Sequence, residues 1–122
     1  MRTCALRGVE AVPVTVEIEV TGGLPGMFIV GMVDTAVQEA RHRVRSAIKA
    51  AGFDMPSDRI VVNLAPANLR KSGSAFDLPI AMAYLIATGQ VPRAAFESMI
   101  AVGELGLEGS VHAVDGLIAY AQ

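Results

Sequence analysis

The sequence predicts a mixed α and β fold, of the α/β or α+β class, in a single domain. Two observations support this prediction. Segments with the period of a strand alternate along the chain with segments that have the period of a helix. The composition also suits one core, because 52% of the 122 residues are hydrophobic and 18% are charged. A chain of this length supports one hydrophobic core rather than two, so we expect residues 1–122 to form one domain.

Three segments have the clearest strand patterns. Val12–Val20 alternates between apolar and polar side chains, which indicates a strand with one buried face. Met27–Gly31 and Arg59–Ala65 are short apolar runs of the kind found in buried strands. Weaker strand patterns cover residues 3–8, 98–105 and 109–114. We expect the last two to be joined around Glu108 and Gly109.

The first helix is predicted to run from Asp34 or Thr35 to about Ala51. Either residue can cap its start, and Thr35 with Gln38 has the spacing of a capping box. Gly52 follows directly and suits the end of a helix, because glycine readily adopts the left-handed conformation found there.

A second helix is predicted over Asp77–Gly89. Asp77 is expected to cap its N-terminus, and Pro79 is tolerated only in its first turn. A third helix is expected to start near Asp115. It reaches Gln122 in apolar residues with no stop signal, so we expect the chain to be part of a longer protein.

The charge and the cysteine content exclude several function classes. The net charge is -2 and the pI is about 5.6, so the molecule as a whole does not attract nucleic acid or an anionic membrane. Cys4 is the only cysteine, which excludes an internal disulfide and a cysteine metal cage. No segment has the pattern of a signal peptide or approaches the roughly 20 apolar residues that span a bilayer. We therefore expect a soluble, cytoplasmic protein with no membrane contact.

Basic side chains follow one flank of the first predicted helix. Arg41, Arg45 and Lys49 recur at intervals of four residues, beside an apolar face centred on Val44. Such a stripe can contact phosphates. The alternative is a solvated helix face, with positive charge favoured near the C-terminal end by the helix dipole. No aromatic residues interleave the stripe to stack on bases, which favours this alternative.

Motifs for nucleotide and metal binding are absent from the sequence. Neither GxxxxGK[ST] nor GxGxxG occurs, so we expect no nucleotide and no other cofactor in this segment. His42 and His112 are far apart along the chain, and two histidines are too few to indicate a metal site. No metal is predicted.

Three separated blocks carry a family resemblance. They read VEAVPVTVEIEVTGGLPGMFIVGMVDTAVQEARHRVRSAIKAAGF, RIVVNLAPANLRKSGSAFDLPIAMAYL and VGELGLEGSVHAVDG. In type and spacing they resemble the N-terminal domain of the ComM/YifB family of magnesium-chelatase-like ATPases. The resemblance implies a two-layer sandwich like domain 2 of ribosomal protein S5, with helices packed on one face of a mixed sheet.

The same resemblance implies a larger machine. In that family the domain precedes an AAA+ ATPase module, which implies ATP and magnesium as cofactors of the parent chain. It also implies a homohexamer, in which the domain contacts its own ATPase module and neighbouring subunits. The implied activity of the parent is ATP-driven branch migration of single-stranded or branched DNA in natural transformation.

The domain is also similar in fold to the proteolytic domain of Lon and to the C-terminal domain of RadA. Aligning RKSGSAFD with the catalytic loop of Lon places Ala75 at the serine nucleophile. Aligning GELGLEGSVHAVDGLI with its second catalytic segment places Ile118 at the lysine. Neither side chain can act as a nucleophile or a base. A displaced pair of Lys71 with Ser72 or Ser74 is the alternative.

Three functional hypotheses follow. The leading one is a non-catalytic N-terminal module of a cytosolic AAA+ ATPase that assists assembly or DNA engagement. Arg70 and Lys71 are expected to be exposed, which makes them secondary candidates for DNA contact after the helix stripe. The alternatives are a Lon-like peptidase with a displaced Ser/Lys pair and a magnesium-chelatase-type subunit.

Overall fold

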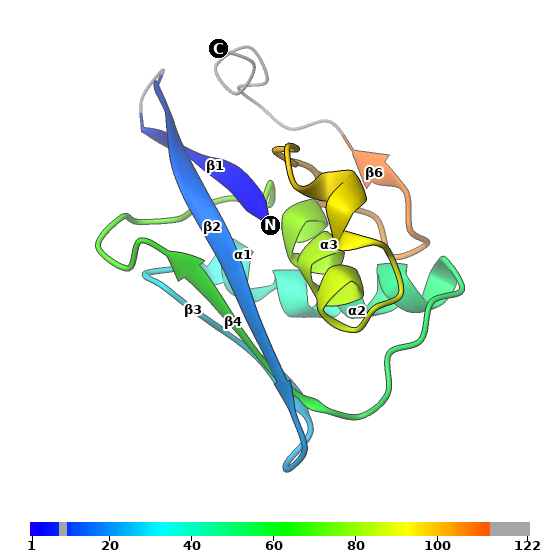
Figure 1. The fold of residues 1–122 in the computed structure, drawn as a ribbon. Coiled ribbons are helices and arrows are strands. Elements are labelled where there is room, and N and C mark those ends of the chain that lie inside the picture. Colours follow the sequence, from blue (N-terminus) through cyan, green and yellow to red (C-terminus); the bar gives the residue numbers. More distant parts are fainter. Residues whose placement is uncertain (8–9, 113–122) are drawn as a thin grey trace.

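Four strands form one mixed sheet in the computed structural model, which describes residues 1–7 and 10–112 (Figure 1). Along the chain they are β1 (Arg2–Arg7), β2 (Glu10–Thr21), β3 (Gly26–Val30) and β4 (Arg59–Ala65). Their order in the sheet is β1-β2-β4-β3. β2 pairs antiparallel with β1 and with β4, whereas β3 pairs parallel with β4. The predicted mixed α and β class is confirmed.

The remaining elements are short helices and a two-stranded ribbon. They are α1 (Thr35–Gln38), α2 (Ala40–Ala50), α3 (Asp77–Ala87), the 3-10 turn η1 (Arg93–Phe96), β5 (Glu104–Leu105) and β6 (Val111–His112). α2 and α3 lie on the same side of the four-stranded sheet (Figure 1), which gives a two-layer arrangement. Within the described residues, none of these helices has the length and apolar character that crossing a bilayer requires.

Alternation along the strands produces the core. β2 buries Val14 and Val16, and β4 buries Ile60, Val62 and Leu64. The helices bury side chains against them, among them Val44, Ile48, Ile80 and Tyr84. Fully burying one such aliphatic side chain contributes roughly 1.5–3 kcal/mol, so this face supplies most of the driving force for folding.

The opposite face of the sheet carries the polar side chains that alternate with the buried ones along β2. Asn63 Nδ2 donates to Glu17 Oε1 at 2.7 Å, between two residues that are paired in register. The Arg59 guanidinium lies 5.3 Å from the centroid of the Phe28 ring. Within the described part of the chain no helix covers this face, which leaves Phe28 44% exposed.

The helix predicted over residues 34–51 is divided at Glu39, so the expectation of one continuous helix is wrong. The His42 amide bonds to the Glu39 carbonyl at 3.1 Å, which is the tighter i to i+3 pattern. The Arg43 guanidinium donates to the Ala36 carbonyl at 3.0 Å. A side chain inserted among helical carbonyls is a common cause of a kink, and it accounts for this break.

The start of the first helix follows one of the two predicted alternatives. Asp34 is the cap, because its Oδ1 accepts from the Val37 amide at 2.9 Å. The capping box of Thr35 with Gln38 does not form. Gln38 Nε2 donates instead to the carbonyl of Ile29 at 2.9 Å, which ties α1 to β3.

The strand predicted over residues 98–105 is shorter than expected. Only β5 is a strand, because the preceding backbone bonds to irregular partners: the Ala101 amide donates to Arg2 and the Gly103 amide to Ala75. β5 and β6 are joined by a turn in which the Gly106 amide donates to the Ser110 carbonyl at 2.8 Å. The helix predicted from Asp115 lies outside the described residues.

The two faces of β4 predict different responses to truncation. Ile60 is fully buried, so Ile60→Ala should lower the free energy of unfolding by about 2–5 kcal/mol. The neighbouring Val61 points to the uncovered face, and Val61→Ala should cost under about 1 kcal/mol. Urea denaturation of both variants measures the difference. Equal losses would contradict the assignment of the two faces.

Candidate functional site

The loop between β4 and α3, residues 66–76, is held by backbone bonds on two sides. On one side the Lys71 amide donates to Met32 at 2.9 Å and the Asp34 amide donates to Lys71 at 3.1 Å. On the other side the Gly103 amide donates to the Ala75 carbonyl at 2.9 Å. The segment that follows β3 and the segment that precedes β5 therefore fix the path of the loop.

Lys71, within this loop, has no exposed surface, so its expected exposure is wrong. Its Nζ donates to the carbonyl of Gly31 at 2.6 Å and to the carbonyl of Pro66. Burial lowers the pKa of Lys71 from its ordinary value. The loop thus closes around its own ammonium group, and a buried ammonium cannot reach a DNA phosphate. This removes Lys71 from the set of direct DNA contacts.

Gly31 makes the lysine site possible. Its φ is +116°, and a Cβ added there would lie 2.4 Å from the carbonyl oxygen of Leu64. A side chain at this position would therefore push β3 away from β4. Only glycine lets the Gly31 carbonyl take its place as an acceptor for Lys71.

Of the two positions aligned with the catalytic pair of Lon, Ala75 and Ile118, only Ala75 lies in the described residues. Ala75 is 6% exposed, so its methyl group packs inside the loop. Ile118 lies outside the described residues. Ser72 is exposed and Ser74 is partly exposed, but the hydrogen bonds of the Lys71 ammonium go to backbone carbonyls rather than to either hydroxyl. A base for those hydroxyls would have to come from another group.

Asp77, at the start of α3, forms a buried ion pair with Arg43 of α2. Arg43 Nε donates to Asp77 Oδ2 at 2.5 Å, and Nη2 donates to Oδ1 at 3.0 Å, which is a two-point contact. The Leu105 amide donates to Asp77 Oδ2 at 3.1 Å. Asp77 has no exposed surface, whereas 20% of the Arg43 side chain is exposed. One carboxylate therefore joins α2, α3 and β5.

The expected role of Asp77 as an N-cap is wrong. Phe76 occupies the cap position, and no side chain caps α3. The carboxylate is drawn away from its own helix by the stronger, charge-assisted bonds from Arg43. These bonds raise the pKa of Arg43, while burial raises the pKa of Asp77 against the opposing effects of Arg43 and the Leu105 amide.

The basic stripe, which we define as Arg41, Arg45 and Lys49, lies on α2 as the spacing predicted. Arg41 and Lys49 are exposed and Arg45 is partly exposed. No carboxylate of the described residues forms an ion pair with any of the three. Within the described part of the chain, the Arg41 side chain has one hydrogen bond, which its Nε donates to His42 Nε2 at 3.4 Å. Arg70 is also exposed, on the loop over Lys71.

Sequence reasoning missed Arg43. It lies between two stripe residues on the same helix, and its own spacing gives no sign of a buried partner. The sequence around its partner does indicate a buried ion pair, because Asp77 is the only charged residue between Lys71 and Arg93. A carboxylate within an apolar helix requires a cation, and Arg43 supplies it.

Comparison with known proteins gives a family. The model of "Subunit ChlI of Mg-chelatase" matches residues 16–122. This chain belongs to that family. It is 46% identical over 121 residues to "Uncharacterized protein YifB" of Salmonella typhimurium and equally to YifB of Escherichia coli, covering 99% of this chain. It is 45% identical over 114 residues to "Competence protein ComM" of Haemophilus influenzae, covering 93% of this chain.

These relatives are much longer than the chain. It covers 24% of each YifB protein and 22% of the ComM protein. The expected resemblance to the ComM/YifB family is confirmed. The relationship concerns about a quarter of each relative, so the activities of the complete proteins enter only as proposals.

Because the Arg43–Asp77 pair is buried, removing Arg43 alone should cost more stability than replacing both residues. Arg43→Met should lower the free energy of unfolding by about 3–5 kcal/mol, because it leaves the buried Asp77 carboxylate without a counter-charge. Adding Asp77→Asn should recover part of this loss, because the amide removes the unpaired charge. Chemical denaturation of the single and double variants measures both effects.

The control for this cycle is Arg41→Met on the same helix. Arg41 is exposed and has no carboxylate partner in the described part of the chain, so its replacement should change stability by no more than about 0.5 kcal/mol. A loss at Arg43 no greater than the loss at Arg41 would show that the pair does not hold the elements together.

Proposed function

We propose that this chain is a non-catalytic module of a longer AAA+ ATPase and that it engages DNA through the basic stripe. The family match and the competence protein among its relatives support the parent assignment. ATP and magnesium would then act in a separate ATPase module. The parent would be a hexamer that moves DNA branches, with this domain contacting its own ATPase module and neighbouring subunits.

The observation that carries the DNA proposal is the separation of roles among the cations of α2. Arg43 is neutralised by Asp77 and approached by Glu39 at 3.7 Å. The stripe residues, two or six positions away along the chain, form no such pair within residues 1–7 and 10–112. Cations without carboxylate partners are available to replace the counterions of a phosphate backbone. Arg70 is a secondary contact on the same grounds.

The loop supports a binding role rather than a hydrolytic one. It retains a fixed path, but the serine position of Lon is a buried alanine and the nearby Lys71 is committed to two carbonyls. A peptidase with a displaced Ser/Lys pair would require Lys71 to leave those carbonyls. No observation in the described residues favours a magnesium-chelatase-type activity beyond the family description itself.

Charge reversal of the stripe tests the proposal. Replacing Arg41, Arg45 and Lys49 together with Glu should remove the part of the salt-sensitive binding to single-stranded DNA that the stripe gives the full-length protein. The slope of log affinity against log salt is negative, and each phosphate contact on a single strand adds roughly 0.7 to its magnitude. If all three residues contact phosphates, this magnitude should decrease by about 2. Fluorescence anisotropy with a labelled oligonucleotide measures this.

A matched pair of double variants separates a site from a general charge effect. Arg41→Glu with Lys49→Glu changes the net charge as much as Arg7→Glu with Arg59→Glu, two exposed arginines on the sheet. Only the first pair should weaken binding. Unchanged affinity in the stripe variants, or equal weakening in both pairs, would leave the stripe as a solvated helix face.

A further inference from the structure

An apolar groove follows one side of α3. Leu78 and Met82, one turn apart on this helix, are only partly buried, and both line the two hollows that form the groove. The larger hollow, of about 430 Å³, lies between α3 and the segment from Phe96 to Val102. The smaller, of about 120 Å³, lies between α3, the end of α2 and Val111 of β6. Among the described residues that line the two hollows, none has a charged or polar side chain.

Large apolar side chains along the groove remain in contact with solvent. Met99 and Ile100 are 50% and 57% exposed, and Val111 at the other end of the groove is 56% exposed. A contiguous apolar surface of this kind usually marks a place where another segment packs. Methionine suits such a place, because its unbranched side chain adapts to the surface that covers it.

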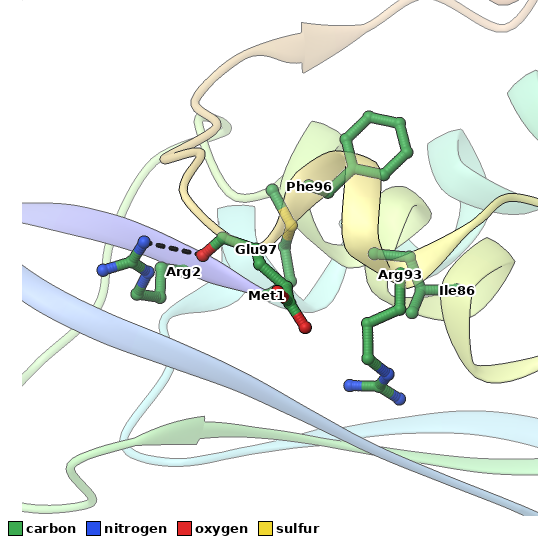
Figure 2. Close-up of a pocket in the computed structure, with 6 residues that line it drawn as sticks. All are labelled: Met1, Arg2, Ile86, Arg93, Phe96 and Glu97. Atoms are coloured by element: carbon green, nitrogen blue, oxygen red, sulfur yellow. Dashed lines mark hydrogen bonds between the residues drawn. The ribbon is translucent and has the colours of Figure 1, made fainter.

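The outer wall of the groove is attached to β1. The Ala101 amide donates to the Arg2 carbonyl at 3.1 Å, and Arg2 forms a parallel bridge with Ile100. Arg2 Nη2 also donates to the backbone carbonyl of Glu97 at 2.7 Å (Figure 2). The segment after η1 is therefore held against β1, and the groove is preformed.

The chain itself contains a segment that fits this groove. β6 ends at His112, and its Val111 lines the smaller hollow, so the chain leaves its described part at the rim of the groove. The next ten residues read AVDGLIAYAQ, with Asp115 as the only charged side chain. Apolar residues recur among them with the i, i+3, i+4, i+7 spacing of an amphipathic helix. This apolar row consists of Val114, Leu117, Ile118 and Ala121.

Attachment to β6 favours this segment over a separate molecule. A few residues of chain join the apolar row to Val111, so its local concentration at the groove is on the order of millimolar. A second copy or a free peptide would bind from its own lower concentration and would lose translational freedom on binding. The apolar row also brings no charge into a groove that offers no counter-charge.

We propose that residues 114–121 pack as a helix in the groove along α3, with the apolar row against Leu78 and Met82. Ile118, the residue aligned with the catalytic lysine of Lon, then contributes packing rather than chemistry. The groove is separate from the basic stripe on α2, so this proposal and the DNA proposal hold or fail independently.

Disulfide trapping in the full-length protein tests this packing. Met82→Cys is combined with Leu117→Cys, Ile118→Cys or Ala119→Cys in a glutathione redox buffer, and peptide mass spectrometry measures the yield of each disulfide. Ala119 is the matched control, because it is tethered at nearly the same distance but lies on the opposite side of the helix. A disulfide requires Cβ atoms about 4 Å apart, so the yield at 117 or 118 should exceed the yield at 119 by at least about fivefold.

A charge in the apolar row provides a second measurement. A carboxylate in an apolar groove is costly, so adding Ile118→Asp to the pair of Met82→Cys with Leu117→Cys should reduce the yield to that of the control. A mixture of isotopically labelled and unlabelled protein shows whether each disulfide forms within one chain. Equal yields at 117, 118 and 119, or disulfides mainly between two chains, would overturn the proposal.

Discussion

The buried contact between Arg43 and Asp77 is the interaction on which the arrangement of the site depends. A carboxylate with no exposed surface receives two bonds from one guanidinium and a third from the Leu105 amide. α2, α3 and β5 are thereby fixed relative to one another at a single point. Breaking such a pair is expensive because the remaining charge stays buried, although its replacement by apolar groups need not be.

This contact also organises the surface of α2. Because Arg43 turns inward to Asp77 and to the Ala36 carbonyl, the helix is kinked at Glu39 and its outer flank carries Arg41, Arg45 and Lys49. On this helix, Arg43 is therefore paired inside the protein, and the three stripe residues face solvent. The division of roles follows from position on the helix rather than from residue type.

Lys71 provides a second internal constraint, on the neighbouring loop. Its ammonium group binds two backbone carbonyls, one at the end of β3 and one just after β4. The loop thus has a defined path, and its lysine is bonded to backbone carbonyls rather than to Ser72 or Ser74. A loop of fixed path with alanine at position 75 is consistent with a surface that binds and positions, which is the role proposed for the domain.

The sequence predicted those features that depend on local pattern. Alternation in β2 and the apolar period of α2 identified the buried Val14, Val16, Val44 and Ile48, and Asp34 was one of two expected caps. The failures share a cause: Arg43, Lys71 and Asp77 are charged residues whose environment is set by partners far along the chain. Local rules place such residues at a surface or a cap, whereas long-range pairing buries them. The short β5 likewise follows from backbone partners that no local pattern specifies.

Amide hydrogen exchange at Leu105 measures directly whether the Arg43–Asp77 pair holds β5, because this amide donates to Asp77 and is not itself altered. In Arg43→Met, under native conditions, we expect the exchange protection of the Leu105 amide to fall at least about tenfold, and that of the Ile60 amide in β4 to fall less. Unchanged protection at Leu105, or equal losses at both amides, would contradict the claim that this pair holds β5 against the two helices.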